Sequence, residues 1–126
     1  MKSDRTAEFF DELGRRAHVP AFDATTATIR LDLEHDHGVD HWFMTISRGV
    51  VHVSRENRDA DAVFRTAKEL FDRVVTGEAS AYAAWVRSEY RVTGEMRLAR
   101  LFQRLLPGRP GAHHPREFAR ARRHQA

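Results

Sequence analysis

The stretch that decides the fold is residues 89–106, EYRVTGEMRLARLFQRLL. Tyr90 and Val92 alternate with polar residues, which is the period of a half-buried strand. Gly94 accepts backbone angles that a side chain forbids, and it therefore predicts a turn. Apolar residues then recur at the spacing of one helical face, at Leu98, Leu101, Phe102 and Leu105. The stretch predicts a strand, a glycine turn and an amphipathic helix over 96–106, and the rest of the chain must cover its apolar face.

Upstream of this stretch the sequence predicts a helix and a meander of three strands. The helix spans 3–17, with Ser3 or Asp4 as its N-cap. Residues 25–34 alternate between apolar and polar side chains and form the clearest strand of the chain. They are followed by a turn over 35–40, a second strand over 41–47 and a third strand over 50–54. Links as short as these join antiparallel neighbours.

The segment after the meander predicts one more strand and two helices. Thr66 and Glu69 have the spacing of a capping box, in which each side chain satisfies a free backbone N–H group of the other residue. This places a helix start directly after Thr66 and leaves 61–65 as a fourth strand. The helix ends at Gly77, a residue typical of helix C-termini. A second, short helix over 79–87 carries a cluster of large side chains, Tyr82, Trp85 and Val86.

The composition suits one globular domain. A chain of 126 residues with 41% hydrophobic residues can bury roughly two-thirds of its unfolded surface. The absence of cysteine excludes disulfides, thiol nucleophiles and thiolate metal sites. No apolar run approaches the ~20 residues that a membrane span needs, and the first ten residues lack the apolar centre of a signal peptide. We expect a cytoplasmic protein.

The positive charge is concentrated at the C-terminus. Residues 107–126 have a net charge of +4, whereas the other 106 residues have a net charge of −1. We therefore divide the chain into a domain over 1–108 and a basic tail over 109–126 without regular structure. A nucleic-acid-binding domain usually carries its basic patch on the folded surface, so we expect no specific nucleic-acid partner. Contact of the tail with an anionic membrane and a purely solubilising tail both stay open.

The sharpest candidate for chemistry is a group of three histidines around the first predicted turn, His35, His37 and His41. Three imidazoles with nearby carboxylates could hold a divalent cation. A metal site also needs an ordered outer shell of partners, so a solvated hairpin turn is the preferred interpretation. The chain contains no phosphate-binding loop, no dinucleotide-binding fingerprint and no nucleophile elbow. We expect no catalytic residue, no bound metal and no cofactor.

The order of the predicted elements resembles the sterol carrier protein type 2-like lipid-binding domain family. The resemblance covers residues 7–108 and rests on four short segments: the tryptophan-bearing strand HWFMTI at 41–46, ADAV at 60–63, the Thr-Gly helix end at 76–77 and the turn VTGE at 92–95. Two positions differ from the family pattern, since Glu95 replaces the usual Asp or Asn and Ser88 stands where glycine is common. The compact form and the abundance of Arg and Ala resemble bacterial stand-alone members.

The resemblance implies an α+β fold, with a five-stranded, largely antiparallel sheet and helices packed on one face around an apolar cavity. It implies binding of a fatty acid, fatty acyl-CoA, sterol or similar lipid without chemistry. It also implies transient contact with a membrane surface or a partner enzyme. The ligand-contacting residues that it implies are Trp42, Met44, Ile46, Leu70, Phe71, Val74, Tyr82, Trp85, Leu98, Leu101, Phe102 and Leu105.

A second interpretation of the same fold stays open. In it, side chains fill the pocket and the domain is an accessory module that docks to a partner enzyme. The volume of the cavity separates the two interpretations, because ligand pockets generally have volumes of roughly 300–1,000 Å³.

Overall fold

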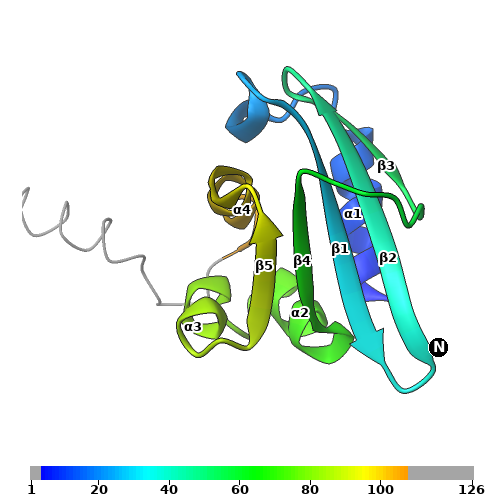
Figure 1. Cartoon of the computed structure of the whole chain (residues 1–126), viewed down its shortest axis with the longest axis vertical. Helices are drawn as coiled ribbons and strands as arrows, with labels where there is room; N and C mark the ends of the chain where they lie inside the picture. Colours follow the sequence, from blue (N-terminus) through cyan, green and yellow to red (C-terminus); the bar gives the residue numbers. More distant parts are fainter. Residues whose placement is uncertain (1–3, 108–126) are drawn as a thin grey trace, which may run out of the picture.

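The structure, a computed structural model, describes residues 4–107 (Figure 1). Within this range the elements are α1 (Arg5–Arg15), the 3-10 helix η1 (Pro20–Phe22), β1 (Thr26–His35), β2 (Gly38–Ser47), β3 (Val50–Ser54), β4 (Ala62–Ala67), α2 (Lys68–Val75), α3 (Ala81–Val86), β5 (Tyr90–Gly94) and α4 (Met96–Gln103). The sequence predicts each of the α-helices and strands, but not η1. The basic tail lies outside the described residues, and the division into domain and tail stays a prediction.

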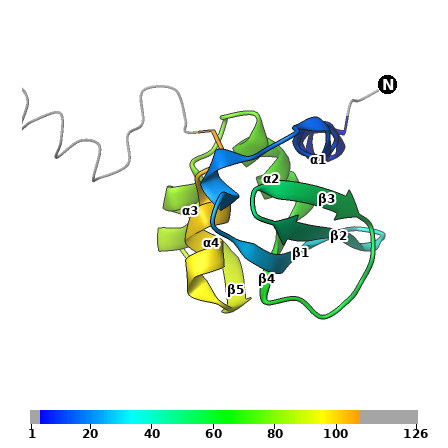
Figure 2. The same cartoon turned by 90° about the horizontal axis from the view of Figure 1, so that it is seen from above.

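One sheet organises the fold. Its strand order is β3-β2-β1-β4-β5, and every neighbouring pair is antiparallel except β1 and β4, which are parallel. The α-helices cover one face of the sheet (Figure 2). Helix α1 contacts β3, α2 contacts β1 and β4, and α3 and α4 contact β5. The predicted α+β fold, with its antiparallel meander and helices on one face, is confirmed.

The helix-facing side of the sheet is apolar because alternate residues of each strand point towards it. Leu31 pairs with Trp42 and Ile29 pairs with Met44 across β1 and β2, and all four side chains are buried. The helices cover these rows with the buried side chains of Phe10, Leu13, Phe71, Leu98 and Phe102. No helix within the described range has both the length and the apolar character needed to cross a lipid bilayer.

The opposite face of the sheet is held together by a buried carboxylate, that of Asp32 in β1. Its side chain is 5% exposed. Arg30 donates hydrogen bonds from Nε and Nη2 to the two carboxylate oxygens at 2.9 and 3.0 Å, and His41 Nδ1 lies 2.8 Å from Oδ1. Arg30 Nη1 also donates to the backbone oxygen of Arg58 at 2.8 Å. The network therefore fastens the link between β3 and β4 to the central strand of the sheet.

The predicted capping box is wrong. Thr66 belongs to β4, and its hydroxyl group donates to the backbone oxygen of Glu89 at 2.9 Å, next to β5. The N-cap of α2 is Ala67, and no side chain makes a capping hydrogen bond there. Pairing with β1 extends β4 as far as Ala67, so sheet formation overrides the local capping pattern and α2 begins one residue later than predicted.

Other predicted boundaries shift by a few residues. The first turn is tighter than predicted, because β1 continues to His35 and β2 begins at Gly38. Helix α1 uses Asp4 as its N-cap, and Ser3 lies outside the described residues. Helix α4 ends at Gln103, three residues before the predicted end. All these shifts lie at element ends, where the sequence pattern is least informative.

Gly94 joins β5 to α4 in a conformation that excludes a side chain. Its φ angle is +92°, in the region that favours glycine. Gly94 pairs with Ala62 across β4 and β5, and the next residue, Glu95, donates its backbone N–H to the carbonyl oxygen of Asp61 at 2.8 Å. A Cβ atom at position 94 would overlap the same Asp61 oxygen. The glycine turn is therefore confirmed, and both its backbone angle and its close contact require glycine.

We predict that Gly94→Ala destabilises the protein by more than about 1 kcal/mol, because alanine disfavours the positive φ and its methyl group overlaps the Asp61 carbonyl. Gly38→Ala is the matched control, since Gly38 has a φ of +137° but no atom within 4 Å of an added Cβ. Urea denaturation measures both changes in the free energy of unfolding. Equal losses in the two variants would contradict a steric constraint at Gly94.

The Asp32 network also predicts how stability depends on pH. Burial raises the pKa of the Asp32 carboxyl group, but hydrogen bonds from Arg30 and His41 outweigh burial and hold that pKa below its usual value of 3.8. Such a group stabilises the folded state above its unfolded pKa, and this contribution is lost as pH falls through the folded pKa.

We therefore expect the free energy of unfolding to fall below about pH 4. Asp32→Asn should lower that free energy at neutral pH and flatten its decline in acid. Asp36→Asn, at the exposed hairpin turn, is the control and should change neither. Urea denaturation at a series of pH values is the measurement, and an unchanged acid slope in Asp32→Asn would refute the assignment.

Candidate ligand-binding site

A small apolar cavity lies between the helices and strands β1, β4 and β5. Its lining residues are Leu31, Phe64, Thr66, Leu70, Phe71, Val74, Ala81, Tyr90, Phe102 and Leu106. Its volume is about 20 Å³, which is enough for roughly one water molecule. Small-molecule pockets usually have volumes of roughly 300 Å³ or more. In this conformation the cavity is therefore too small for a lipid chain.

Aromatic rings fill the space that a ligand would need. The rings of Phe102 and Phe64 meet edge to face with their centroids 5.1 Å apart, and Phe102 stacks against Phe71 at 6.5 Å. Phe71 in turn stacks against Phe10 at 6.0 Å, and Phe10 stacks on Trp42 at 4.5 Å. These rings belong to α4, β4, α2, α1 and β2. Enlarging the cavity therefore requires the helices to move away from the sheet or the rings to change rotamer.

A larger space is open to the surface between α1 and the end of the described chain. Its lining residues are Phe9, Glu12, Leu13, Arg16, Arg104, Leu105, Leu106 and Pro107. We call it the α1 groove. Its volume is about 380 Å³, within the range of ligand pockets. Leu106 lines both the groove and the cavity, so this side chain lies at the boundary between the two spaces.

The cavity contains two hydroxyl groups, and both have protein partners. Thr66 donates to the backbone oxygen of Glu89, and Gln103 Nε2 donates to the Tyr90 hydroxyl oxygen at 3.1 Å. Burial raises the pKa of Tyr90 to about 12, so its phenol is neutral at physiological pH. The walls of the cavity are thus suited to holding apolar groups rather than to proton transfer.

The α1 groove combines an apolar floor with charged groups at its rim. Phe9, Leu13 and Leu105 supply apolar surface. Arg16 lies 3.8 Å from Glu12, one helical turn away, in an exposed ion pair. Arg104 forms no ion pair with any residue in the range 4–107. An amphiphile with an apolar chain and an anionic head group matches this combination.

The structure brings together only part of the predicted ligand-contacting set. Four of the predicted residues line the cavity, namely Leu70, Phe71, Val74 and Phe102. One lines the α1 groove, Leu105. Five pack in or against the core, Trp42, Met44, Ile46, Leu98 and Leu101. The remaining two, Tyr82 and Trp85, are 41% and 37% exposed. Helix α3 does not turn these two large side chains inward, because Ala81 and Ala84 take the inward positions.

Sequence reasoning missed several lining residues. Phe64 and Tyr90 occupy the helix-facing side of β4 and β5, and the alternation of apolar residues within those strands carried that signal. Phe9 and Leu13 belong to the helix that the sequence predicts over 3–17, but the pattern does not assign them to a site. Leu106, which lines the same groove, lies more than ninety residues further along the chain, and local periodicity contains no information about which distant residues line a common groove.

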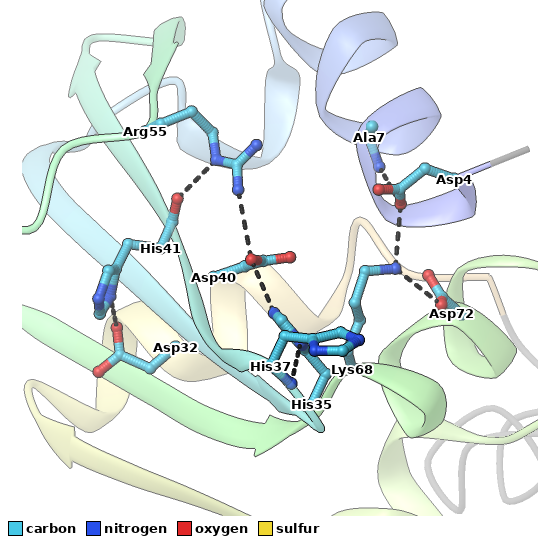
Figure 3. Close-up of polar contacts among 10 residues, drawn as sticks. All are labelled: Asp4, Ala7, Asp32, His35, His37, Asp40, His41, Arg55, Lys68 and Asp72. Atoms are coloured by element: carbon cyan, nitrogen blue, oxygen red, sulfur yellow. Dashed lines mark hydrogen bonds and ion pairs between the residues drawn. The ribbon is translucent and has the colours of Figure 1, made fainter.

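A polar network ties α1, a wall of the groove, to α2, a wall of the cavity (Figure 3). The carboxylate of Asp72 accepts hydrogen bonds from the backbone N–H and the hydroxyl group of Thr6 at 3.1 and 2.6 Å. Lys68 Nζ donates to Asp72 at 3.0 Å and to Asp4 at 3.2 Å. Burial raises the pKa of Asp4, but hydrogen bonds from Ala7 and Lys68 outweigh it and hold that pKa below its ordinary value.

The three histidines of the candidate metal site do not converge on one point (Figure 3). His35 Nε2 lies 2.9 Å from Asp40 Oδ1, whereas His41 Nδ1 lies 2.8 Å from Asp32 Oδ1. Among residues 4–107, no three His, Asp or Glu side chains are grouped so that they could hold a metal ion. Within the described chain, the interpretation of a polar hairpin end agrees with this geometry.

Comparison with solved structures finds the same fold in several proteins. The apo form of Sterol Carrier Protein 2 from Yarrowia lipolytica is 19% identical, with a TM-score of 0.54, over 80% of this chain and 73% of that chain. The palmitated SCP2L2 from Aedes aegypti is 14% identical, with a TM-score of 0.64, over 90% and 100%. The sec-alkylsulfatase from Pseudomonas sp. is 20% identical, with a TM-score of 0.63, over 86% of this chain but 17% of that chain.

The family comparison covers most of the chain. The curated proteins include no significant match. The model of the SCP-2 sterol transfer family, however, matches residues 10–107. This range contains the whole sheet and the helices α2, α3 and α4, and it confirms the resemblance seen in the order of the sequence motifs. The chain therefore belongs to the SCP-2 sterol transfer family.

Proposed function

We propose that this protein binds and carries a lipid with a long apolar chain, without chemical change to it. The observation that carries the proposal is the pairing of two apolar spaces, the α1 groove and the cavity, which share the side chain of Leu106. Membership of the SCP-2 sterol transfer family supports it, as does the similarity of the fold to that of a palmitated protein.

In this proposal the lipid chain first lies in the α1 groove, on Phe9, Leu13 and Leu105. The free end of the lipid chain then enters the cavity as the side chain of Leu106 moves aside and the ring of Phe102 changes rotamer. Each methylene group of the lipid that is removed from water contributes ~0.8 kcal/mol to the free energy of binding. Affinity therefore comes from the burial of apolar surface and needs few hydrogen bonds. Arg16 and Arg104 at the rim favour an anionic head group, such as a fatty carboxylate, although the neighbouring Glu12 opposes it.

The second candidate function is an accessory module that docks to an enzyme. Two observations favour it: the cavity has a volume of about 20 Å³, and a similar fold makes up 17% of the alkylsulfatase chain. Under this alternative the purified protein contains no lipid and takes none up.

Native mass spectrometry of freshly purified protein, followed by organic extraction, separates the two functions. A carrier is expected to show an added mass that disappears on denaturation and reappears in the extract as a lipid. Protein without added mass that also fails to bind a fluorescent long-chain fatty acid, an acyl-CoA and a sterol would favour the accessory module.

Leu105→Asp should weaken the binding of a fluorescent long-chain fatty acid at least about tenfold, because a carboxylate then stands on the apolar floor of the groove. Leu101→Asp is the matched control. Leu101 is a half-buried leucine one helical turn earlier, and it lines neither the groove nor the cavity. Fluorescence titration gives the dissociation constants, and circular dichroism checks that both variants fold. Equal weakening by the two folded variants would count against the groove.

A further inference from the structure

Helix α1 is fastened to α2 at its N-terminal end by polar contacts. The carboxylate of Asp72 accepts hydrogen bonds from the backbone N–H and the hydroxyl group of Thr6, a fully buried residue. Lys68 Nζ donates to Asp72 and also to Asp4, the N-cap of α1 (Figure 3). We call these residues the α1 latch. Carboxylates at the first turn of a helix accept from N–H groups that the helix itself leaves free, so the latch holds this end of α1 against α2.

The other end of α1 is attached through the backbone. Val19 is buried, and its N–H group donates to the carbonyl oxygen of Gly49, in the turn between β2 and β3, at 2.7 Å. Between this anchor and the end of the helix, residues 16–18 are exposed. Hinges are usually a few residues at the end of an element that absorb a change in backbone angles. Helix α1 is therefore held by a hinge at one end and by the α1 latch at the other.

The side chain of Phe9, in the middle of α1, stands between the groove and the cavity. Phe9 lines the α1 groove. Its ring meets the rings of Phe71 and Phe102 edge to face, with centroids 6.0 and 6.3 Å away, and both of these rings line the cavity. The ring of the next residue, Phe10, stacks against Phe71 as well. A movement of α1 away from the sheet therefore withdraws both of its rings from the wall of the cavity.

We propose that α1 is a gate between the groove and the cavity, and that the α1 latch holds this gate closed until a lipid chain enters. The inference rests on the proposed function and deepens it, because it names the contacts that control entry to the site. With the gate closed, the cavity has a volume of about 20 Å³, so a lipid chain in the cavity and a closed gate exclude each other. A contact that stabilises only the closed state reduces the fraction of molecules able to bind, and it therefore weakens the apparent affinity for lipid.

The chemistry of the α1 latch suits reversible opening. The side chains of Lys68 and Asp72 are 21% and 29% exposed, so water can take over their hydrogen bonds when the gate opens. Burial lowers the pKa of Lys68, but hydrogen bonds to Asp72 and Asp4 outweigh burial and raise that pKa above 10.5, which keeps the ammonium group charged at physiological pH. Ion pairs that water reaches contribute modestly to stability, so the burial of a lipid chain can outweigh the loss of the latch.

Hydrogen–deuterium exchange of the lipid-free full chain tests the α1 latch itself. Lys68→Met removes the charge that joins the two carboxylates, and Thr6→Val removes the hydroxyl donor at nearly constant volume. Both substitutions should accelerate exchange over residues 5–15, while β1 and β2 stay as protected as in the wild type. Arg73→Met is the matched control, because Arg73 is an exposed cation of the same helix that forms no ion pair within residues 4–107.

Titration of the same proteins with a fluorescent long-chain fatty acid tests the gate. Because the latch opposes the state that binds lipid, Lys68→Met should bind the fatty acid at least about threefold more tightly than the wild type, and it should associate faster. The same variant should be less stable to urea in the absence of lipid. Arg73→Met should match the wild type in affinity and in stability. A purely structural role of Lys68 would give the opposite pattern, in which lower stability accompanies weaker binding.

Unchanged exchange over α1 in both latch variants, or weaker fatty-acid binding by folded Lys68→Met protein, would overturn the proposal. Faster exchange that extends over the whole sheet would also count against it, because it would show a destabilised fold rather than a local opening. If neither the wild type nor the variants bind a fatty acid, an acyl-CoA or a sterol, the proposed function fails. The exchange comparison then still decides for or against an opening of α1 at the latch, which keeps the two failures distinct.

Discussion

The parallel pairing of β4 with β1 is the constraint on which the rest of this fold depends. The first three strands form a simple meander, and a fourth strand added by another hairpin would have lain beside β3. The chain instead crosses the sheet and pairs with the far side of β1. Arg30 holds this crossing in place, since its guanidinium group joins the buried Asp32 carboxylate to the backbone at Arg58. Strand β5 and helices α2, α3 and α4 all take their positions from β4.

The arrangement that follows from this pairing has a close-packed aromatic cluster between the helices and the sheet. The family to which the chain belongs is nevertheless named for sterol transfer. Phe10, Phe64, Phe71 and Phe102 come from four different elements, and their rings occupy the space between helices and sheet. Protein interiors reach this density because every void forfeits dispersion contacts. Under the proposed function, a lipid enters this space only when the helices and the sheet separate or the rings change rotamer, because the packed rings leave a cavity of about 20 Å³.

The α1 groove is the surface feature on which the proposed carrier function depends. It offers an apolar floor and a basic rim, which suits a lipid in transit. The groove is lined by Leu106, which also packs against the small buried cluster of Val74, Ala79 and Ala81. The last described side chains therefore connect the proposed lipid site to the buried cluster beside α3.

The sequence by itself determined the strands, the α-helices and the glycine turn at Gly94, because alternation, helical spacing and backbone freedom are local properties of the chain. The fold class followed from the resemblance of their order to the family. The sequence also contained the inward rows of Phe64 and Tyr90 within their strands. Only the tertiary structure decided that Thr66 donates a hydrogen bond to Glu89 rather than capping α2, that α3 turns Ala81 and Ala84 inward, and that Phe9 and Leu13 line one groove with Leu106. These outcomes depend on packing between segments that are far apart in the sequence. The periodic pattern of a segment reports its own secondary structure and does not identify the distant segment against which it packs.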